Sequence, residues 1–193
     1  MDYRFLFNSI RYIILNPNKA WRVINEEKRP IKDVRNSFFF PLVLIVTVCS
    51  FLGSIIFTNS TLSPIYSVFV ALKFLILHLF VVFTAAVIFG EMTKALDLGK
   101  NFTLSFKIIA YSIAPLIICQ IISHLFESLI FVNILSLYGL YIFWIGAEKM
   151  LDPPEHKKMP MLVTTFVVVA GLYIAGTFVL TSLTDRVYFA FFA

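Results

Sequence analysis

The stretch Ile65–Phe89 reads IYSVFVALKFLILHLFVVFTAAVIF, and it decides the fold class. It holds one cation, Lys73, and one histidine, His78, among apolar, aromatic and hydroxyl-bearing residues. At ~1.5 Å per residue, a helix of this length covers the ~30 Å hydrocarbon core of a bilayer. The stretch is therefore predicted to be a membrane-spanning helix.

Apolar runs of similar length recur along the chain. Of 193 residues, 60% are hydrophobic and 14% are charged, whereas a soluble domain carries about 25% charged residues. Four further runs are predicted to span the membrane: Phe38–Phe57, Phe106–Phe126, Leu129–Gly146 and Met159–Leu183. The predicted fold is all-α, a polytopic membrane protein with five transmembrane helices. The predicted division is a cytoplasmic segment, 1–37, and a five-helix membrane domain, 38–193.

The cytoplasmic segment is amphipathic and basic. Tyr3–Leu15 is predicted to form a helix that is too short to span, with one largely apolar face. It lies either in the membrane interface or against the cytoplasmic ends of the spans, and the sequence leaves both open. Asn16-Pro17 ends it, and Asn18 is predicted to cap a second short helix, Lys19–Glu27.

The cations predict the orientation. The first 37 residues hold eight Lys and Arg, whereas the connection Thr58–Pro64 holds none. Cation-rich and cation-poor connections then alternate in step with five crossings. Because Lys and Arg favour cytoplasmic loops, the N-terminus is predicted to be cytoplasmic and the C-terminus to lie outside.

Polar side chains within the spans are the candidate functional residues, because hydrocarbon penalises them. They are Lys73, His78, Gln120 and Asn133. Gln120 and Asn133 fall in the third and fourth spans, which are predicted to be antiparallel neighbours. Hydrogen bonds between helices are the simpler interpretation, and the lining of a polar path is the alternative.

Lys73 is the deepest of the cations, roughly 12 Å inside the predicted outer boundary of its span. It is predicted to point into the bundle and to pair with Glu127 or Asp185, directly or through water. The alternative is a lipid-facing lysine whose side chain extends toward the outer headgroups.

Nothing in the sequence predicts a catalytic, cofactor or metal site. The three histidines, His78, His124 and His156, are predicted to lie at different depths, and no Cys or His pair has metal-ligand spacing. Phosphate-loop, serine-elbow and zinc-protease motifs are absent from the sequence. Cys49 and Cys119 lie in apolar runs and are expected to pack as small hydrophobic residues. The net charge of +5 comes from cations near the membrane surface, so no nucleic-acid partner is predicted.

Short motifs in a fixed order resemble the Yip family of membrane proteins, named for interaction with Ypt/Rab GTPases, and its prokaryotic branch more than its Golgi members. The motifs are Asn16–Trp21, Phe40-Pro41-Leu42, Ala110–Pro115 with Tyr111 and Pro115, Tyr138-Gly139-Leu140-Tyr141, and Trp144-Ile145-Gly146. The resemblance implies five spans, a cytoplasmic N-terminus and, for this branch, the bacterial cytoplasmic (inner) membrane. The Asp-Leu-Tyr-Gly-Pro motif of the eukaryotic members is missing, so Rab binding is not carried over.

Together these features predict a non-enzymatic membrane scaffold or accessory subunit. It would act through lipid and through another membrane protein or a second copy of itself. The alternative prediction is a small transporter or channel that uses the polar residues within the spans.

Overall fold

The computed structural model describes residues 3–57 and 64–192, and the described residues contain helices and no strand. In chain order the elements are α1 (Tyr3–Leu15), α2 (Pro17–Glu27), α3 (Ile31–Val34), the π-helix η1 (Arg35–Phe39), α4 (Phe40–Phe57), α5 (Pro64–Ala95), α6 (Phe102–Ser112), α7 (Ala114–Leu125), the 3₁₀ helix η2 (Glu127–Leu137), α8 (Tyr138–Leu151) and α9 (Glu155–Phe191).

Five helical stretches are long and apolar enough to cross a membrane, which confirms the predicted fold class. They are Ile31–Phe57, Pro64–Ala95, Phe102–Leu125, Glu127–Leu151 and Glu155–Phe191. Each begins or ends beyond the apolar run from which it was predicted, because a helix continues into polar sequence until a capping or breaking residue stops it.

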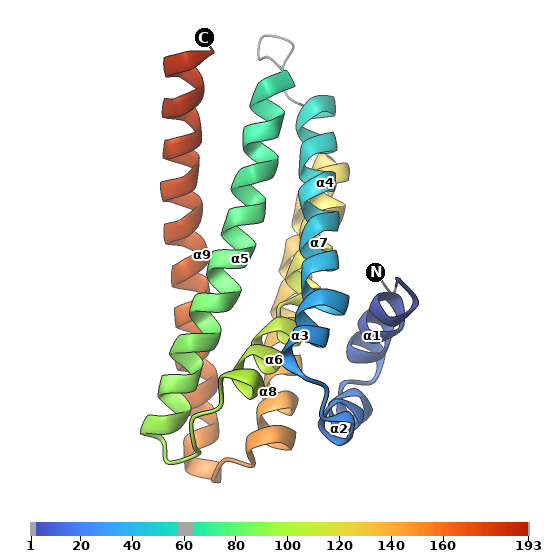
Figure 1. Ribbon diagram of the computed structural model, residues 1–193, viewed down its shortest axis with the longest axis vertical. Coiled ribbons are helices and arrows are strands. Elements are labelled where there is room, and N and C mark those ends of the chain that lie inside the picture. The colour runs from blue at the N-terminus through green and yellow to red at the C-terminus, as the bar shows by residue number, and fades with distance from the viewer. Residues whose placement is uncertain (1–2, 58–63, 193) are drawn as a thin grey trace.

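The long helices α5 and α9 stand side by side at one edge of the molecule, while α1 and α2 lie beside its lower half (Figure 1). α5 also packs against α4, and α4 packs against α7. The largest fully buried side chains include Trp21, Phe38, Phe39 and Phe106, so the N-terminal helices contribute to the core of the bundle. By contrast, α9 buries only Met161, Thr165 and Tyr188 among its 37 residues.

The first span starts earlier than predicted. Pro30 precedes α3, and helical structure then continues without interruption through η1 into α4. The expected division between residues 37 and 38 therefore falls inside a continuous helix. A short π-helix such as η1 widens one turn, and here it turns Phe38 and Phe39 fully inward.

The third span is broken at Ile113, between α6 and α7. Pro115 lies in the first turn of α7, where its missing N–H is tolerated. Its ring would collide with the carbonyl of Tyr111 in a continuous helix, which explains why the helix restarts at this point.

The turn between the third and fourth spans is as tight as predicted. α7 ends at Leu125 and η2 begins at Glu127, so Phe126 alone separates them. The two elements pack along one another. The upper part of the fourth span is 3₁₀ helix, and η2 buries none of its own residues.

The N-terminal helices fold with one correction. α1 spans Tyr3–Leu15, as predicted. α2 begins at Pro17, before the predicted Lys19, and Asn16 rather than Asn18 stands at its N-cap. Asn16 and Asn18 are the same capping residue type, and the prediction overlooked proline's preference for the first helical position. Lys28 adopts a left-handed conformation, with φ 43°, and ends α2.

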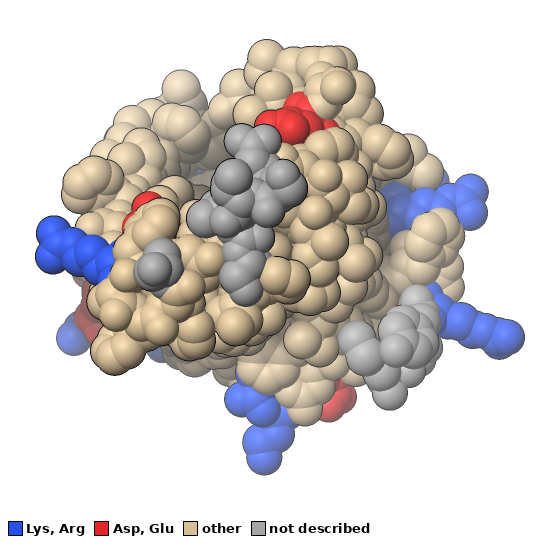
Figure 2. Space-filling view, turned by 90° about the horizontal axis from the view of Figure 1, so that it is seen from above, with Lys and Arg blue, Asp and Glu red and all other residues tan. Residues whose placement is uncertain are grey.

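Charge separates the two ends of the bundle. The end of α5, the start of α6 and the α8–α9 connection all meet at the lower end (Figure 1). They carry Lys94, Lys100, Lys149, Lys157 and Lys158. The opposite end, seen from above, presents mostly uncharged residues, with Lys and Arg only around its rim (Figure 2).

Candidate functional site

Trp21 fastens the N-terminal helices to the bundle. Its indole is fully buried, and Nε1 donates a hydrogen bond of 2.9 Å to the carbonyl oxygen of Ile142 on α8. The ring lies against Gly146, where a Cβ atom would come within 2.5 Å of it. Only glycine therefore lets α8 approach the indole this closely.

Tyr111 forms the other wall of this anchor. Its ring meets Trp21 edge-on, with ring centroids 5.7 Å apart, and packs on Phe38 at 4.3 Å. The side chain is 2% exposed. Its hydroxyl makes no hydrogen bond to another described residue.

Tyr138 and Gly139 make two further close contacts. The Tyr138 hydroxyl donates a hydrogen bond of 2.8 Å to the carbonyl oxygen of Ile14 in the last turn of α1. That carbonyl has no partner within α1, so the tyrosine satisfies it and fastens the helix. A Cβ on Gly139 would come within 2.5 Å of the Ser112 carbonyl oxygen, so α8 meets the α6–α7 break directly.

The residues on which the family resemblance rests thus gather in one region. Trp21, Tyr111, Tyr138 and Gly146 join α1 and α2 to the bundle, Gly139 brings α8 against the α6–α7 break, and Pro115 lies just after it. Trp144, which is half-buried, lines a small hollow near the α8–α9 connection.

A groove separates α1 from α2 and has Tyr111 at its floor. It has a volume of about 520 Å³. Polar side chains from both helices line it, together with apolar side chains such as Phe5 and Ile24. Arg29 contacts both an apolar and a polar residue of the lining. Its Cζ lies 4.2 Å from the centre of the Phe5 ring, and its Nε donates a 2.7 Å hydrogen bond to Glu27 Oε2.

Two of the predicted intramembrane polar residues meet in the bundle. His78 on α5 is fully buried, and its Nε2 lies 2.7 Å from Oε1 of Gln120 on α7. Its Nδ1 lies 2.7 Å from the Phe74 carbonyl oxygen, so this nitrogen donates; in the neutral ring Nε2 then accepts, and the Gln120 amide must turn its NH2 group toward it. The pair joins two helices by a hydrogen bond, which is the arrangement expected for polar groups in hydrocarbon.

In contrast to this pair, three buried side-chain atoms form no hydrogen bond within the distance and angle limits among the described residues: Ser112 Oγ, His124 Nε2 and Tyr173 Oη. Ser112 and Tyr173 both line a hollow of about 140 Å³ between α9 and the α6–α8 layer. Tyr173 also lines a wider, open groove along α9 that reaches Asp185. We call these two hollows together the α9 crevice.

Lys73 is half-buried and has its nearest polar partner on α9. Its Nζ lies 3.4 Å from Thr181 Oγ1 and 5.0 Å from the centre of the Phe74 ring. Asp185, one helical turn beyond Thr181, accepts a 3.1 Å hydrogen bond from the Tyr66 hydroxyl. In the described part of the chain no direct ion pair joins Lys73 to Glu127 or to Asp185. Glu127 instead faces an outer hollow lined by Tyr66 and His124.

Asn133 does not join the polar pair. It lies on η2 and donates a 3.0 Å hydrogen bond to the Ile130 carbonyl oxygen of its own helix. The third and fourth spans pack against each other, as predicted, but the Gln120 side chain turns toward α5.

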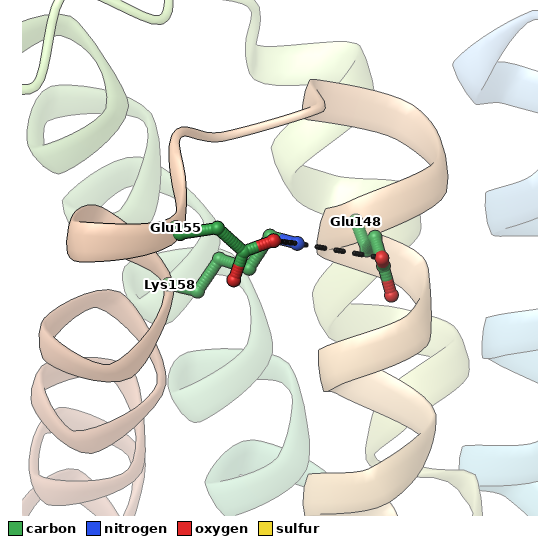
Figure 3. A network of polar contacts seen from close by, with 3 residues as sticks. All are labelled: Glu148, Glu155 and Lys158. Carbon is green, nitrogen blue, oxygen red and sulfur yellow. Dashed lines mark hydrogen bonds and ion pairs between the residues drawn. The ribbon is translucent and has the colours of Figure 1, made fainter.

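Ion pairs of Lys158 link α8 to α9 at the lower end of the bundle (Figure 3). Lys158 on α9 lies 2.6 Å from Glu155 Oε1 and 3.4 Å from Glu148 Oε1 on α8. Lys157 donates a 2.6 Å hydrogen bond to the Leu96 carbonyl oxygen, which ties α9 to the end of α5.

No group of three or more His, Cys, Asp or Glu side chains within the described ranges could hold a metal ion. Cys49 and Cys119 are buried free thiols.

The family model described as the Yip1 domain matches residues 11–182, from within α1 to within α9. No curated protein and no solved structure matches the chain.

Proposed function

The chain belongs to the Yip1 domain family of membrane proteins, and on that premise we propose that it is a non-enzymatic scaffold or accessory subunit. It holds a transmembrane helix of another membrane protein, or of a second copy, in the α9 crevice. The observation that carries this proposal is the sparse packing of α9. In the most apolar part of this helix, only 6% of the residues are buried in the fold.

Exposure to lipid alone does not drive helix association, because lipid tails are as apolar as leucine. Small and hydroxyl-bearing residues do favour it, since they permit close approach and hydrogen bonding. The α9 crevice presents such residues in Thr177, Thr181 and Ser182. Tyr173 adds a further hydroxyl to the same lining. A partner helix that supplies a hydrogen-bonding side chain fits this lining.

Photocrosslinking in the native membrane tests the proposal. A photoreactive residue at Ile174 or Phe178, both lining the crevice, is expected to give one adduct of defined mass. The control is Ile76 on α5, which is also exposed, at 49%, but lies outside the crevice. Identical adduct patterns from all three positions, or none from the crevice, would refute a specific partner. Two differently tagged copies distinguish self-association from a foreign subunit.

The transporter alternative has less support. His78 and Gln120 bind each other across two helices, and Asn133 binds its own helix, so these groups satisfy packing needs. Proteoliposomes that move an ion or solute, with flux lost in Gln120→Leu, would instead favour that alternative.

The protein is an integral membrane protein, and we place it in a bacterial cytoplasmic membrane with its N-terminus in the cytoplasm and its C-terminus outside. The proposed orientation is supported by the positive-inside rule, because the lower end is rich in cations, among them Lys94, Lys149 and Lys157.

A further inference from the structure

We propose that the groove between α1 and α2 binds the phosphate-bearing headgroup of an anionic phospholipid. This inference concerns the opposite side of the bundle from α9 and is independent of the proposed scaffold role.

The lining of the groove suits a phosphodiester. Arg11 and Arg29 supply two guanidinium groups, and Asn8, Ser9 and Asn16 supply neutral hydrogen-bonding side chains. Glu27, the groove's carboxylate, engages Nε of Arg29 at 2.7 Å. The terminal nitrogens of that guanidinium make no hydrogen bond to a described residue, and they present a fork that matches phosphate oxygens.

Tyr111 supplies a second, independent indication of a ligand. Its side chain is 2% exposed and lies at the floor of the groove. Its ring is held by Trp21 and Phe38, yet its hydroxyl has no hydrogen-bond partner in the described protein. Because Tyr111 lines the groove, its hydroxyl is available to a bound group there, and a phosphate oxygen in the groove would accept its hydrogen.

The position of the groove selects a lipid over a soluble anion. α1 packs on the bundle through Leu6 and Ile13, while Phe7 is 67% exposed and Leu15 62% exposed on its outer side. A helix with apolar side chains turned outward in this way lies at the membrane surface. The groove therefore opens beside acyl chains, and Leu15 belongs both to that exposed set and to the groove lining. Arginines at a cytoplasmic surface of this kind attract anionic headgroups.

Thermal unfolding of the full chain in neutral detergent tests the proposal, with short-chain phosphatidylglycerol as the probe. Short-chain phosphatidylcholine and inorganic phosphate, at matched ionic strength, are the comparison arms. Phosphatidylglycerol is expected to raise the Tm, and the other two probes are not. An equal rise with inorganic phosphate would overturn the lipid as ligand, and equal rises with both lipids would overturn headgroup recognition.

Single variants locate the site. Tyr111→Phe keeps the ring contacts and removes a hydroxyl that the protein does not use. Its Tm without lipid is therefore expected to stay unchanged, while its lipid affinity falls about tenfold. Arg11→Gln and Arg29→Gln should weaken binding at least as much, with a smaller dependence on salt. Arg4→Gln removes the same charge from α1 outside the groove and is the matched control. Wild-type affinity in Tyr111→Phe and both groove arginine variants, or an equal loss in Arg4→Gln, would refute the proposal.

Discussion

The indole of Trp21 lies against Gly146, with its Nε1 bonded to the carbonyl oxygen of Ile142 one turn earlier on α8. The glycine supplies the space and the carbonyl supplies the acceptor, so one turn of α8 satisfies both the bulk and the polarity of the tryptophan. The N-terminal helices are thereby part of the core and not an appendage to it.

Gly146→Ala is expected to loosen this anchor. The new methyl group would lie within 2.5 Å of the indole, so the ring or α8 must shift, at a cost of about 1–3 kcal/mol. A lower Tm and faster proteolysis of the first 30 residues would report it. Gly171→Ala on α9 is the matched control, since no atom lies within 4 Å of the position. If the two variants behave alike, the anchor does not limit stability.

Tyr138→Phe is expected to free the end of α1 while leaving the bundle intact. It removes the hydrogen bond to the Ile14 carbonyl, worth about 1 kcal/mol. Amide hydrogen exchange across α1 should accelerate, with no comparable change in α5. Tyr141→Phe, at a neighbouring exposed ring, should leave α1 exchange as in the parent protein. Unchanged exchange in Tyr138→Phe would mean that packing of Leu6 and Ile13 alone holds the helix.

His78 and Gln120 are expected to be energetically coupled. Gln120→Leu leaves the buried Nε2 of His78 without its partner, at a cost of about 1–3 kcal/mol. Gln120→Leu should then cost less in a His78→Phe background than alone. Asn133→Leu, which breaks only a bond within η2, should be close to neutral. Additive losses in the cycle would show that the two side chains act separately.

Lys73 is expected to be coupled to Asp185 more strongly than to Glu127. The Lys73 ammonium lies 3.4 Å from Thr181 Oγ1, and Asp185 follows Thr181 by one turn of the same helix. Lys73→Met should lower the Tm, and Asp185→Asn should then cost less in that background than alone. Glu127→Gln serves as the comparison. A Lys73→Met protein as stable as the parent would favour the lipid-facing alternative.

Cysteine labelling in a background without Cys49 and Cys119 tests the orientation. His156→Cys at the lower end is expected to react only from the cytoplasmic side. Ser60→Cys, outside the described residues, and Arg186→Cys near the end of α9 are expected to react from the outside. Reversed accessibility would overturn the orientation, and reaction of His156→Cys and Ser60→Cys from one side would change the number of spans.

The sequence was sufficient for the five spans, because each apolar run is long enough to cross a bilayer without any tertiary information. It was also sufficient for α1, whose end is marked by Asn16-Pro17. The break at Ile113 was missed although Pro115 signalled it, since proline is tolerated in membrane helices and the apolar run continues through it. The 3₁₀ geometry of η2 has no comparable signal in the sequence.

The groove between α1 and α2 could not be predicted from the sequence, for a different reason. Its lining unites residues 5–29 with Tyr111, and no periodicity within one helix indicates a contact across that separation. The family-like motifs did mark Trp21, Tyr111 and Gly146, but as separate short matches without a shared location. Only the fold shows that they touch.

The Trp21–Ile142 bond joins positions 121 residues apart, and this sets an order of events during synthesis. α1 and α2 leave the ribosome first, yet the carbonyl and the glycine that receive the indole arrive only with the fourth span. Until then the apolar face of the nascent amphipathic segment can be buried only at the bilayer surface. The N-terminal helices can therefore complete their docking only after the fourth span has been synthesised.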